Sequence, residues 1–213
     1  MEFLNYVVHN APTILDLTGE HLQLALMGVL CALLVGVPVG IFISRHPRWV
    51  GPVLWITNAI QTIPSLALIG FVMIFLGLSR ETGVTVLFLY ALMPIIRNTY
   101  TGVTAVDSGI IEAARGMGMT SWQILRMVQL PLALAIILVG VRVALVTAVG
   151  TASMMSLAGA GGLGELIFAG IDRVNTKMIL GGALPAAMLA VLAEVGIGAL
   201  ERKLTPGGLQ PTR

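Results

Sequence analysis

Long stretches without a charged residue restrict this chain to a membrane-embedded fold. Such windows cover residues 22–44, 49–79, 82–96, 127–141, 143–164 and 178–193. Hydrophobic residues make up 57% of the chain and charged residues only 10%, whereas a soluble domain carries about 25% charged residues. The chain lacks the polar surface that would keep it in water, so the sequence predicts an integral membrane protein.

Five transmembrane helices fit these windows, because a helix needs about 20 residues to cross roughly 30 Å of hydrocarbon. The alternating pattern of membrane strands is missing from the sequence, and we therefore predict an all-α fold. Residues 1–20 are expected to form an external lead-in, residues 21–204 the transmembrane domain, and residues 205–213 a cytoplasmic tail. The predicted spans are 22–43, 54–78, 83–103, 132–153 and 178–200.

The basic residues predict the orientation of these spans. With five spans, one side of the membrane receives Arg45, Arg48, Arg97, Arg115, Arg126, Arg202, Lys203 and Arg213. The opposite side receives Arg80, Arg173 and Lys177. Because basic loops stay in the cytoplasm, we expect the N-terminus outside the cell membrane and the C-terminus inside it.

A polar segment at 107–130 interrupts the apolar spans, and its first half has the residues of a short capped helix. Asp107 or Ser108 is expected to cap the N-terminus of this helix. Gly116 and Gly118 are expected to end it, because glycine is favoured just beyond helix C-termini.

The second half of the segment predicts another helix. Thr120 and Gln123 have the spacing of a capping box, which starts a helix. Pro131 disfavours helical geometry at Leu130 and is expected to mark the boundary with the next span. The product is a cytoplasmic helical hairpin, with Ile110, Ile111, Ala113, Ala114, Met117 and Met119 available to a partner protein.

The hairpin also carries a recognisable motif. Glu112-Ala113-Ala114, Gly118 and Leu130-Pro131 resemble the E-A-A-x3-G-x9-I-x-L-P signature of permease subunits in ATP-binding-cassette importers, with Val128 in place of the isoleucine. The resemblance implies that the hairpin docks on a separate ATPase, with Glu112 paired to a basic group there or to Arg115. The residues expected to couple the two chains are Glu112, Ala113, Ala114, Arg115, Gly116, Gly118, Leu130 and Pro131.

The resemblance extends over nearly the whole chain. Segments 19–22, 61–67, 94–102, 140–142, 161–164 and 201–206 are similar to the permeases of osmoprotectant importers for glycine betaine, carnitine and choline. This family implies a type I importer fold, a second permease copy or homologue, two cytoplasmic ATPases and a separate external substrate-binding protein.

A quaternary ammonium is usually held by aromatic rings. Tyr90, Phe88, Phe71 or Phe75 is available, but we expect such a cage on the binding protein.

Several chemistries are disfavoured by the sequence. The two lysines, Lys177 and Lys203, do not follow a glycine, so the G-x4-G-K-[ST] phosphate-binding pattern is absent. ATP and Mg²⁺ are therefore expected on the ATPase, and this chain is expected to be non-catalytic. A single cysteine and three scattered histidines give no metal-ligand spacing, and no nucleic-acid partner is expected. The glycine-rich run 158–164 is interpreted as a close-packed external segment.

Alternatives to this function remain open. One is a related importer for amino acids. Another is a stand-alone secondary transporter, which would need no docking hairpin, and no inverted repeat is evident. A third is a structural or assembly subunit.

Polar groups within the spans are candidates for the transport pathway, which we expect between two permease chains. An equally weighted alternative is that they hydrogen-bond between helices, which contributes about 0.6 kcal/mol on average. The candidates in the second and fourth spans are Asn58, Gln61, Thr62, Ser65, Thr147, Thr151 and Ser153.

Arg142 and Glu194 are ionisable residues within predicted spans, where such residues are usually paired or functional. At 1.5 Å per residue, Arg142 lies roughly 16 Å beyond Pro131 and Glu194 roughly 12 Å before Arg202. Their similar depths allow an ion pair between the fourth and fifth spans. In the alternative, Glu194 reaches cytoplasmic water and Arg142 caps backbone carbonyls freed by a kink.

Overall fold

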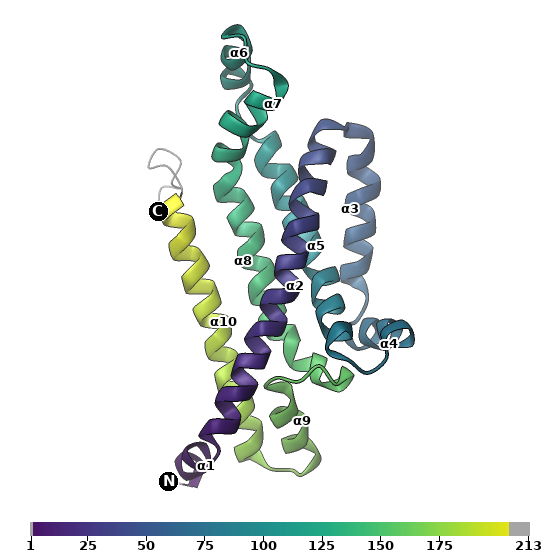
Figure 1. Cartoon of the computed structure of the whole chain (residues 1–213), viewed down its shortest axis with the longest axis vertical. Coiled ribbons are helices and arrows are strands. Elements are labelled where there is room, and N and C mark those ends of the chain that lie inside the picture. Colours follow the sequence, from purple (N-terminus) through teal and green to yellow (C-terminus); the bar gives the residue numbers. More distant parts are fainter. Residues whose placement is uncertain (1, 205–213) are drawn as a thin grey trace.

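The computed structural model describes residues 2–204, which form an elongated, all-helical bundle (Figure 1). The expected tail at 205–213 lies outside the described residues. The helices are α1 (Glu2–His9), α2 (Ala11–Arg45), α3 (Pro47–Thr62), α4 (Ser65–Leu76), α5 (Arg80–Thr104), α6 (Ser108–Gly116), α7 (Ser121–Ile124), the π-helix η1 (Leu125–Gln129), α8 (Leu130–Met155), the 3-10 helix η2 (Ser156–Ala158), α9 (Gly164–Asp172) and α10 (Thr176–Leu204).

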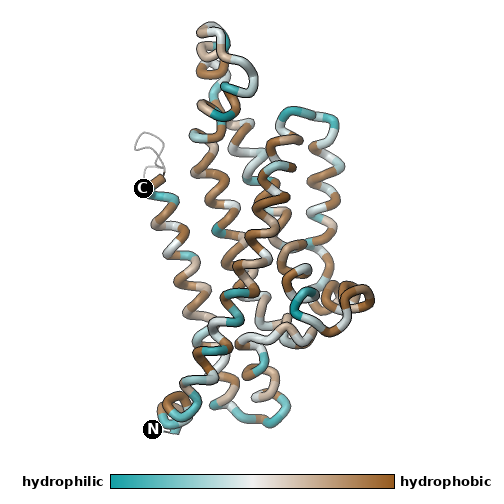
Figure 2. The backbone as a smooth tube through the Cα atoms, in the orientation of Figure 1, coloured by the Kyte–Doolittle hydropathy of each residue, from teal (hydrophilic) through white to brown (hydrophobic). Residues whose placement is uncertain are grey.

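Four helical stretches of the described chain are long and apolar enough to cross a membrane. They are Ala11–Arg45, Arg80–Thr104, Ser121–Ala158 and Thr176–Leu204. The bent pair α3 and α4 brings the number to five if it is counted as one span. The predicted all-α membrane fold is confirmed. Hydrophobic residues follow the length of the helices, and hydrophilic residues gather at the turns that connect them (Figure 2).

The second span is not the continuous helix predicted over 54–78. The chain turns by 102° between α3 and α4. Ile63 is extended, with φ −70° and ψ 127°, because the ring of Pro64 disfavours helical geometry in the residue before it. Gln61 donates a 2.8 Å hydrogen bond to the carbonyl of Tyr90, and the Tyr90 hydroxyl donates to the carbonyl of Ile63. The break is thus stabilised from α5.

The boundary predicted at Pro131 is wrong. Leu130 is helical, with φ −63° and ψ −45°, and one helical stretch continues from Ser121 to Ala158. Proline cannot donate to the carbonyl four residues earlier and its ring crowds that carbonyl. The helix widens into the π-turn η1 instead of ending, and Leu130 N–H donates to the carbonyl of Leu125.

The first long helix begins at Ala11, well before the span predicted from residue 22. Ile14 and Leu17 explain the earlier start, because they are buried against Leu163 and Leu166 from the segment that precedes and enters α9. Within the predicted lead-in 1–20, residues 2–20 therefore comprise the short helix α1 and the first turns of α2, rather than a separate segment. The predicted bounds of the third and fifth spans differ from α5 and α10 by a few residues.

Helix α5 lies at the centre of the bundle and packs against α2 and α8. Small residues allow this close approach. A Cβ built on Gly28 or Gly40 of α2 would stand 2.6 Å from the Cβ of Leu87 or Thr99 of α5, and one on Gly140 of α8 would stand 2.7 Å from the Cβ of Asn98. Helices α2, α5 and α8 therefore form a rigid frame, which positions the α6–α7 hairpin and the polar side chains between the helices.

Candidate functional site

The hairpin α6–α7 projects beyond the helix bundle at the end that also contains the α2–α3 turn and the C-terminal end of α10 (Figure 1). Asp107 starts α6, and its carboxylate accepts hydrogen bonds from the backbone N–H groups of Gly109 and Ile110 at 2.8 and 3.3 Å. Of the two predicted caps, Asp107 is therefore the one that caps α6. Its negative charge also suits the positive end of the helix dipole.

Gly118 makes the bend between the two short helices. Its φ is +81°, in the left-handed region that glycine adopts without steric cost. Met119 N–H donates to the carbonyl of Ala114 at 3.1 Å, and Gly118 N–H donates to that of Arg115 at 2.9 Å. This is the Schellman pattern, which satisfies the last carbonyls of the helix. Gly116 belongs to α6 and shows no positive φ.

The predicted capping box starts α7. Gln123 N–H donates to the Thr120 hydroxyl at 3.3 Å, and Thr120 N–H donates to the Gln123 side-chain oxygen at 2.7 Å. Because both ends of the bend are fixed by local bonds, the hairpin is a preformed element.

The outer surface of the hairpin is exposed and partly apolar. Met117 is 76% exposed and Ile110 46% exposed, and Glu112 and Ala113 are also exposed. Ala114, which the sequence suggested as available to a partner, is only 2% exposed and instead packs inside the chain. Glu112 makes no ion pair within residues 2–204, whether with Arg115 or with another cation.

Arg45, the last residue of α2, ties the hairpin to the bundle. Its guanidinium donates to the carbonyl of Ser121 at 2.9 Å and to the side-chain oxygen of Gln129 at 3.4 Å. The Gln129 amide donates in turn to the carbonyl of Val103 at 3.3 Å. These bonds connect α7 and η1 to the ends of α2 and α5.

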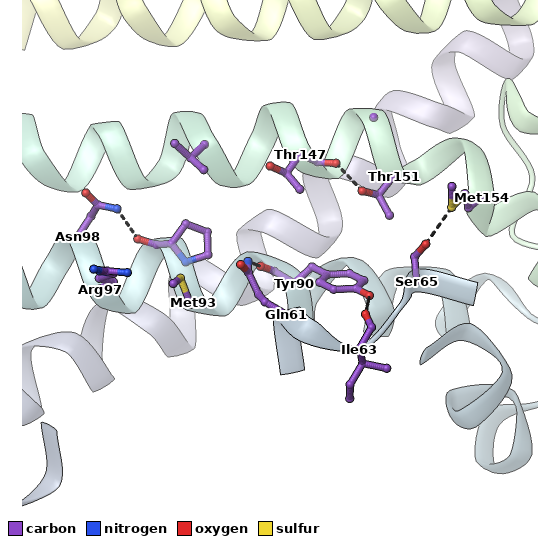
Figure 3. Close-up of a pocket in the computed structure, with 13 residues that line it drawn as sticks. Gln61, Ile63, Ser65, Tyr90, Met93, Arg97, Asn98, Thr147, Thr151 and Met154 are labelled. Atoms are coloured by element: carbon purple, nitrogen blue, oxygen red, sulfur yellow. Dashed lines mark hydrogen bonds between the residues drawn. The ribbon is translucent and has the colours of Figure 1, made fainter. Parts of the chain in front are cut away.

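A cavity of about 630 Å³ lies between the α3–α4 bend, α5 and α8 (Figure 3). Four of the seven predicted pathway residues line it: Gln61, Ser65, Thr147 and Thr151. Ser65 donates to the sulfur of Met154 at 2.9 Å, and Thr151 donates to the carbonyl of Thr147 at 2.8 Å.

The other three predicted pathway residues lie elsewhere. Asn58 lines a neighbouring cavity of about 340 Å³. The Thr62 hydroxyl donates to the carbonyl of Ala59, and Ser153 accepts a hydrogen bond from Ser156 through its carbonyl. Neither Thr62 nor Ser153 is among the described residues that line these two cavities.

The sequence analysis missed Arg97 and Asn98, which line the larger cavity. We counted Arg97 among the basic residues on the cytoplasmic side of the membrane, but α5 continues for seven residues beyond it to Thr104. The signal available from the sequence was that an ionisable residue lies inside the predicted span 83–103, where such residues are usually functional.

Arg142 of α8 contacts two carboxylates of α10. Its Nη1 lies 3.5 Å from Oε1 of Glu194 and 3.6 Å from Oε2 of Glu201. Glu194 and Glu201 are seven residues apart and so lie on one face of the helix, with Gly198 between them; a Cβ on Gly198 would stand 3.5 Å from the same Nη1. The ion pair raised from the sequence is present in the structure, and Glu201 is a second acid that the sequence analysis did not consider.

At the opposite end of the bundle, the glycine-rich segment packs against the start of α2. Glu20 accepts a 3.0 Å hydrogen bond from Gly162 N–H, and the buried His21 donates to the carbonyl of Val149 at 2.9 Å. The ammonium of Lys177 in α10 lies 2.7 Å from the carboxylate of Glu2 in α1, and it lowers the pKa of that carboxyl by hydrogen bonding and by charge. These contacts fix the N-terminal region to α8 and α10.

Comparisons with known proteins agree with these features. Residues 32–206 match the family model "Binding-protein-dependent transport system inner membrane component". The chain is 46% identical over 202 residues to a glycine betaine/carnitine/choline transport system permease protein of Bacillus subtilis, covering 94% of this chain and 88% of the relative. It is 43% identical over 206 residues to a carnitine transport permease protein of Listeria monocytogenes, covering 96% and 92%.

An osmoprotectant import permease protein of Salmonella typhimurium is 40% identical over 215 residues, covering 99% of this chain and all of the relative. Among solved structures, an inward-facing MetNI methionine ABC transporter is similar with a TM-score of 0.80 and 25% identity, covering 91% of this chain and 96% of the matched chain. The described helices thus have the arrangement of an ABC importer permease.

Proposed function

Because this chain belongs to the family of binding-protein-dependent transport system inner membrane components, we propose that it imports quaternary ammonium osmoprotectants such as glycine betaine, carnitine or choline. Members of this family are non-catalytic, multi-pass subunits of the inner membrane, and ATP is hydrolysed by a separate ATPase. The observation that carries the solute assignment is the identity of 40–46% over nearly the whole chain to permeases named for these compounds.

The hairpin 107–130 is the proposed docking element for the ATPase. Its two helices are capped by their own side chains and are held to the bundle by Arg45, so it can transmit force without first having to fold. Met117 and Ile110 offer exposed apolar surface, which suits insertion of a short helix into a groove. Glu112 is exposed and is available to a basic group of that groove.

The proposed topology has the N-terminus outside and the hairpin and C-terminus in the cytoplasm. The hairpin, the α2–α3 turn and the C-terminal end of α10 lie at one end of the bundle, and α1 lies at the other (Figure 1). Basic residues are concentrated at the first end, including Arg45, Arg115 and Arg202, which the positive-inside rule assigns to the cytoplasm.

A second permease chain, identical or homologous, is part of the proposal, as is an external substrate-binding protein. The cavity beside α5 and α8 is open rather than enclosed, and much of α4 is apolar and exposed, with Phe71 58% and Phe75 72% exposed. A second copy would complete the cavity walls, and lipid would cover the remaining apolar surface.

An amino-acid importer is the second candidate, favoured by the similarity to the methionine transporter structure. The two candidates are separated by ATP-driven uptake into proteoliposomes that contain the chain, its ATPase and its binding protein. We expect uptake of radiolabelled glycine betaine, carnitine or choline and none of methionine. Uptake of methionine alone would refute the osmoprotectant assignment, and uptake without the ATPase would refute the importer.

A further inference from the structure

Arg97 gives the larger cavity an uncompensated positive charge. Among the described residues that line this cavity, it is the only charged one. It also lines the neighbouring cavity with Asn58 and Trp55, so it stands at the boundary between the two. Figure 3 shows its guanidinium beside Met93 and Asn98.

Arg97 forms no ion pair with any residue from 2 to 204. The three ion pairs in the part of the chain that the structure describes involve Arg142 and Lys177, and the amide of the neighbouring Asn98 donates to the carbonyl of Pro94 instead. An ionisable side chain within a membrane helix is costly and by default serves a function. An unpaired guanidinium beside a cavity therefore points to an anionic group that is supplied from elsewhere.

A carboxylate is the anion that matches this site. The planar guanidinium presents parallel N–H donors that bind both oxygens of a carboxylate, with a strength roughly twice that of neutral hydrogen bonds. A solute cation that carries no carboxylate meets only repulsion at the same position, and the repulsion is strengthened by the low dielectric of the surrounding helices.

We propose that Arg97 binds the carboxylate of a solute crossing the cavity, so that the permease favours zwitterionic quaternary ammonium compounds over choline. Glycine betaine and carnitine carry a carboxylate and choline does not. The inference rests on the proposed function. It assigns to the permease a selection step that is independent of the binding protein.

The neutral polar side chains near Arg97 are consistent with a cavity through which a solute passes. The Thr151 hydroxyl donates to the backbone carbonyl of Thr147, and the Gln61 amide donates to the carbonyl of Tyr90. Their hydrogen bonds are made within the chain, which leaves Arg97 as the dominant electrostatic feature of the cavity. Tyr90, seven residues before Arg97, lies on the same face of α5 and lines the cavity as well.

A transport assay tests the proposal directly. Uptake of glycine betaine, carnitine and choline is measured at saturating, solute-loaded binding protein for the wild type and for Arg97→Gln, Arg97→Met and Arg97→Lys. We expect the ratio of glycine betaine to choline uptake to fall about tenfold in the two neutral variants, since a hydrogen bond to a charged group contributes at least that factor. Arg97→Lys should retain most of the ratio. Arg80→Gln removes a charge from the other end of α5 and should leave the ratio unchanged.

A second measurement does not depend on which solutes the binding protein accepts. In a Cys31→Ala background, Thr151→Cys is modified with anionic sulfonatoethyl methanethiosulfonate or with its cationic trimethylammonium counterpart. We expect Arg97→Gln to lower the anion-to-cation ratio of the modification rates about fivefold. A positive charge that lines the same cavity as residue 151 attracts the anionic reagent and repels the cationic one. Val174→Cys, in the turn between α9 and α10, is the control whose ratio should not change.

The outcomes separate this inference from the proposed function. An equal loss of uptake for all three solutes, as expected if Arg97 contacts a lipid phosphate, would overturn it, and so would an unchanged ratio in both assays. A wild type that imports no quaternary ammonium compound would refute the proposed function instead, while the thiol labelling would still report the charge of the cavity.

Discussion

Gly118 is the residue whose conformation the hairpin depends on most. At φ +81°, a residue with a side chain is strained by about 1–3 kcal/mol. We expect Gly118→Leu to abolish ATP-driven uptake while the permease remains inserted and folded, because the bend that orients α6 against the ATPase is lost. Uptake and co-purification of the ATPase are the measurements.

Gly51 of α3 provides the matched control for this substitution. It lies outside the hairpin at an exposed position, its φ is not positive, and a Cβ there meets nothing within 4 Å. Gly51→Leu should therefore retain uptake. Normal coupling of ATP hydrolysis to uptake in Gly118→Leu would reject the assigned role of the bend.

Arg142 contacts two carboxylates, so substitutions of Arg142 and of Glu194 should lower the stability by different amounts. Removal of Glu194 leaves Arg142 with Glu201 at 3.6 Å, whereas removal of Arg142 deprives both carboxylates of the guanidinium that they contact. We expect Arg142→Ala to lower the thermal unfolding midpoint by about 2–4 °C, corresponding to roughly 1 kcal/mol for a chain of this size. Glu194→Ala should lower it less, by an amount that differential scanning fluorimetry resolves.

The double variant tests the coupling between these residues. Arg142→Ala combined with Glu194→Ala should cost less than the sum of the two single losses, since both single variants remove the same contact and Arg142→Ala alone leaves the Glu194 carboxylate without Arg142. Strict additivity would contradict an energetically significant contact. Arg48→Ala, at an exposed position, controls for the loss of a basic residue.

At the scale of elements, Arg45 connects the hairpin to the frame. Its bonds to Ser121 and Gln129 are the direct polar links between the end of α2 and the α7–η1 region. We expect Arg45→Ala to reduce uptake severalfold while ATP hydrolysis falls less, because the hairpin still docks but moves independently of α2. The ratio of solute imported to ATP hydrolysed is the measurement.

Arg48→Ala is again the control, since it removes a basic residue from the same turn without a bond to the hairpin. Equal ratios of solute imported to ATP hydrolysed in Arg45→Ala and in the wild type would show that this link is dispensable.

Local chemistry explains which elements were predictable from the sequence. The caps of the hairpin depend on contacts between residues two to five positions apart, at Asp107, Gly118 and Thr120, and these contacts follow from residue type. The motif residues Glu112, Ala113 and Ala114 were placed on a helix for the same reason, although the sequence could not indicate that Ala114 faces inward.

The two prolines show where local rules are insufficient. Pro64 and Pro131 both disfavour helical geometry in the preceding residue, yet the chain breaks at the first and continues through the second. The difference lies in distant partners: Tyr90 accepts and donates the bonds that stabilise the break at Ile63, while the widened turn at 125–129 accommodates Pro131 within a continuous helix. Contacts of this kind are set by packing, which also brings Arg97 to the cavity.

At the scale of the whole molecule, the topology is testable by thiol accessibility. In a Cys31→Ala background, Val174→Cys should react with a membrane-impermeant maleimide added to intact cells, because this residue is 90% exposed at the end proposed to lie outside. Met117→Cys should react only after permeabilisation. The reverse pattern would invert the proposed orientation and place the hairpin away from any cytoplasmic ATPase.

Docking of the hairpin on the ATPase is the claim on which the account depends most, and site-specific photo-crosslinking measures it directly. A benzophenone side chain replaces Met117, which is 76% exposed at the bend, in the assembled transporter, and a second variant carries it at Val174 as the control at the opposite end. We expect an ultraviolet-dependent adduct between the permease and the ATPase from position 117 and none from position 174. An ATPase adduct from position 174, or its absence from position 117 in an actively transporting complex, would contradict it.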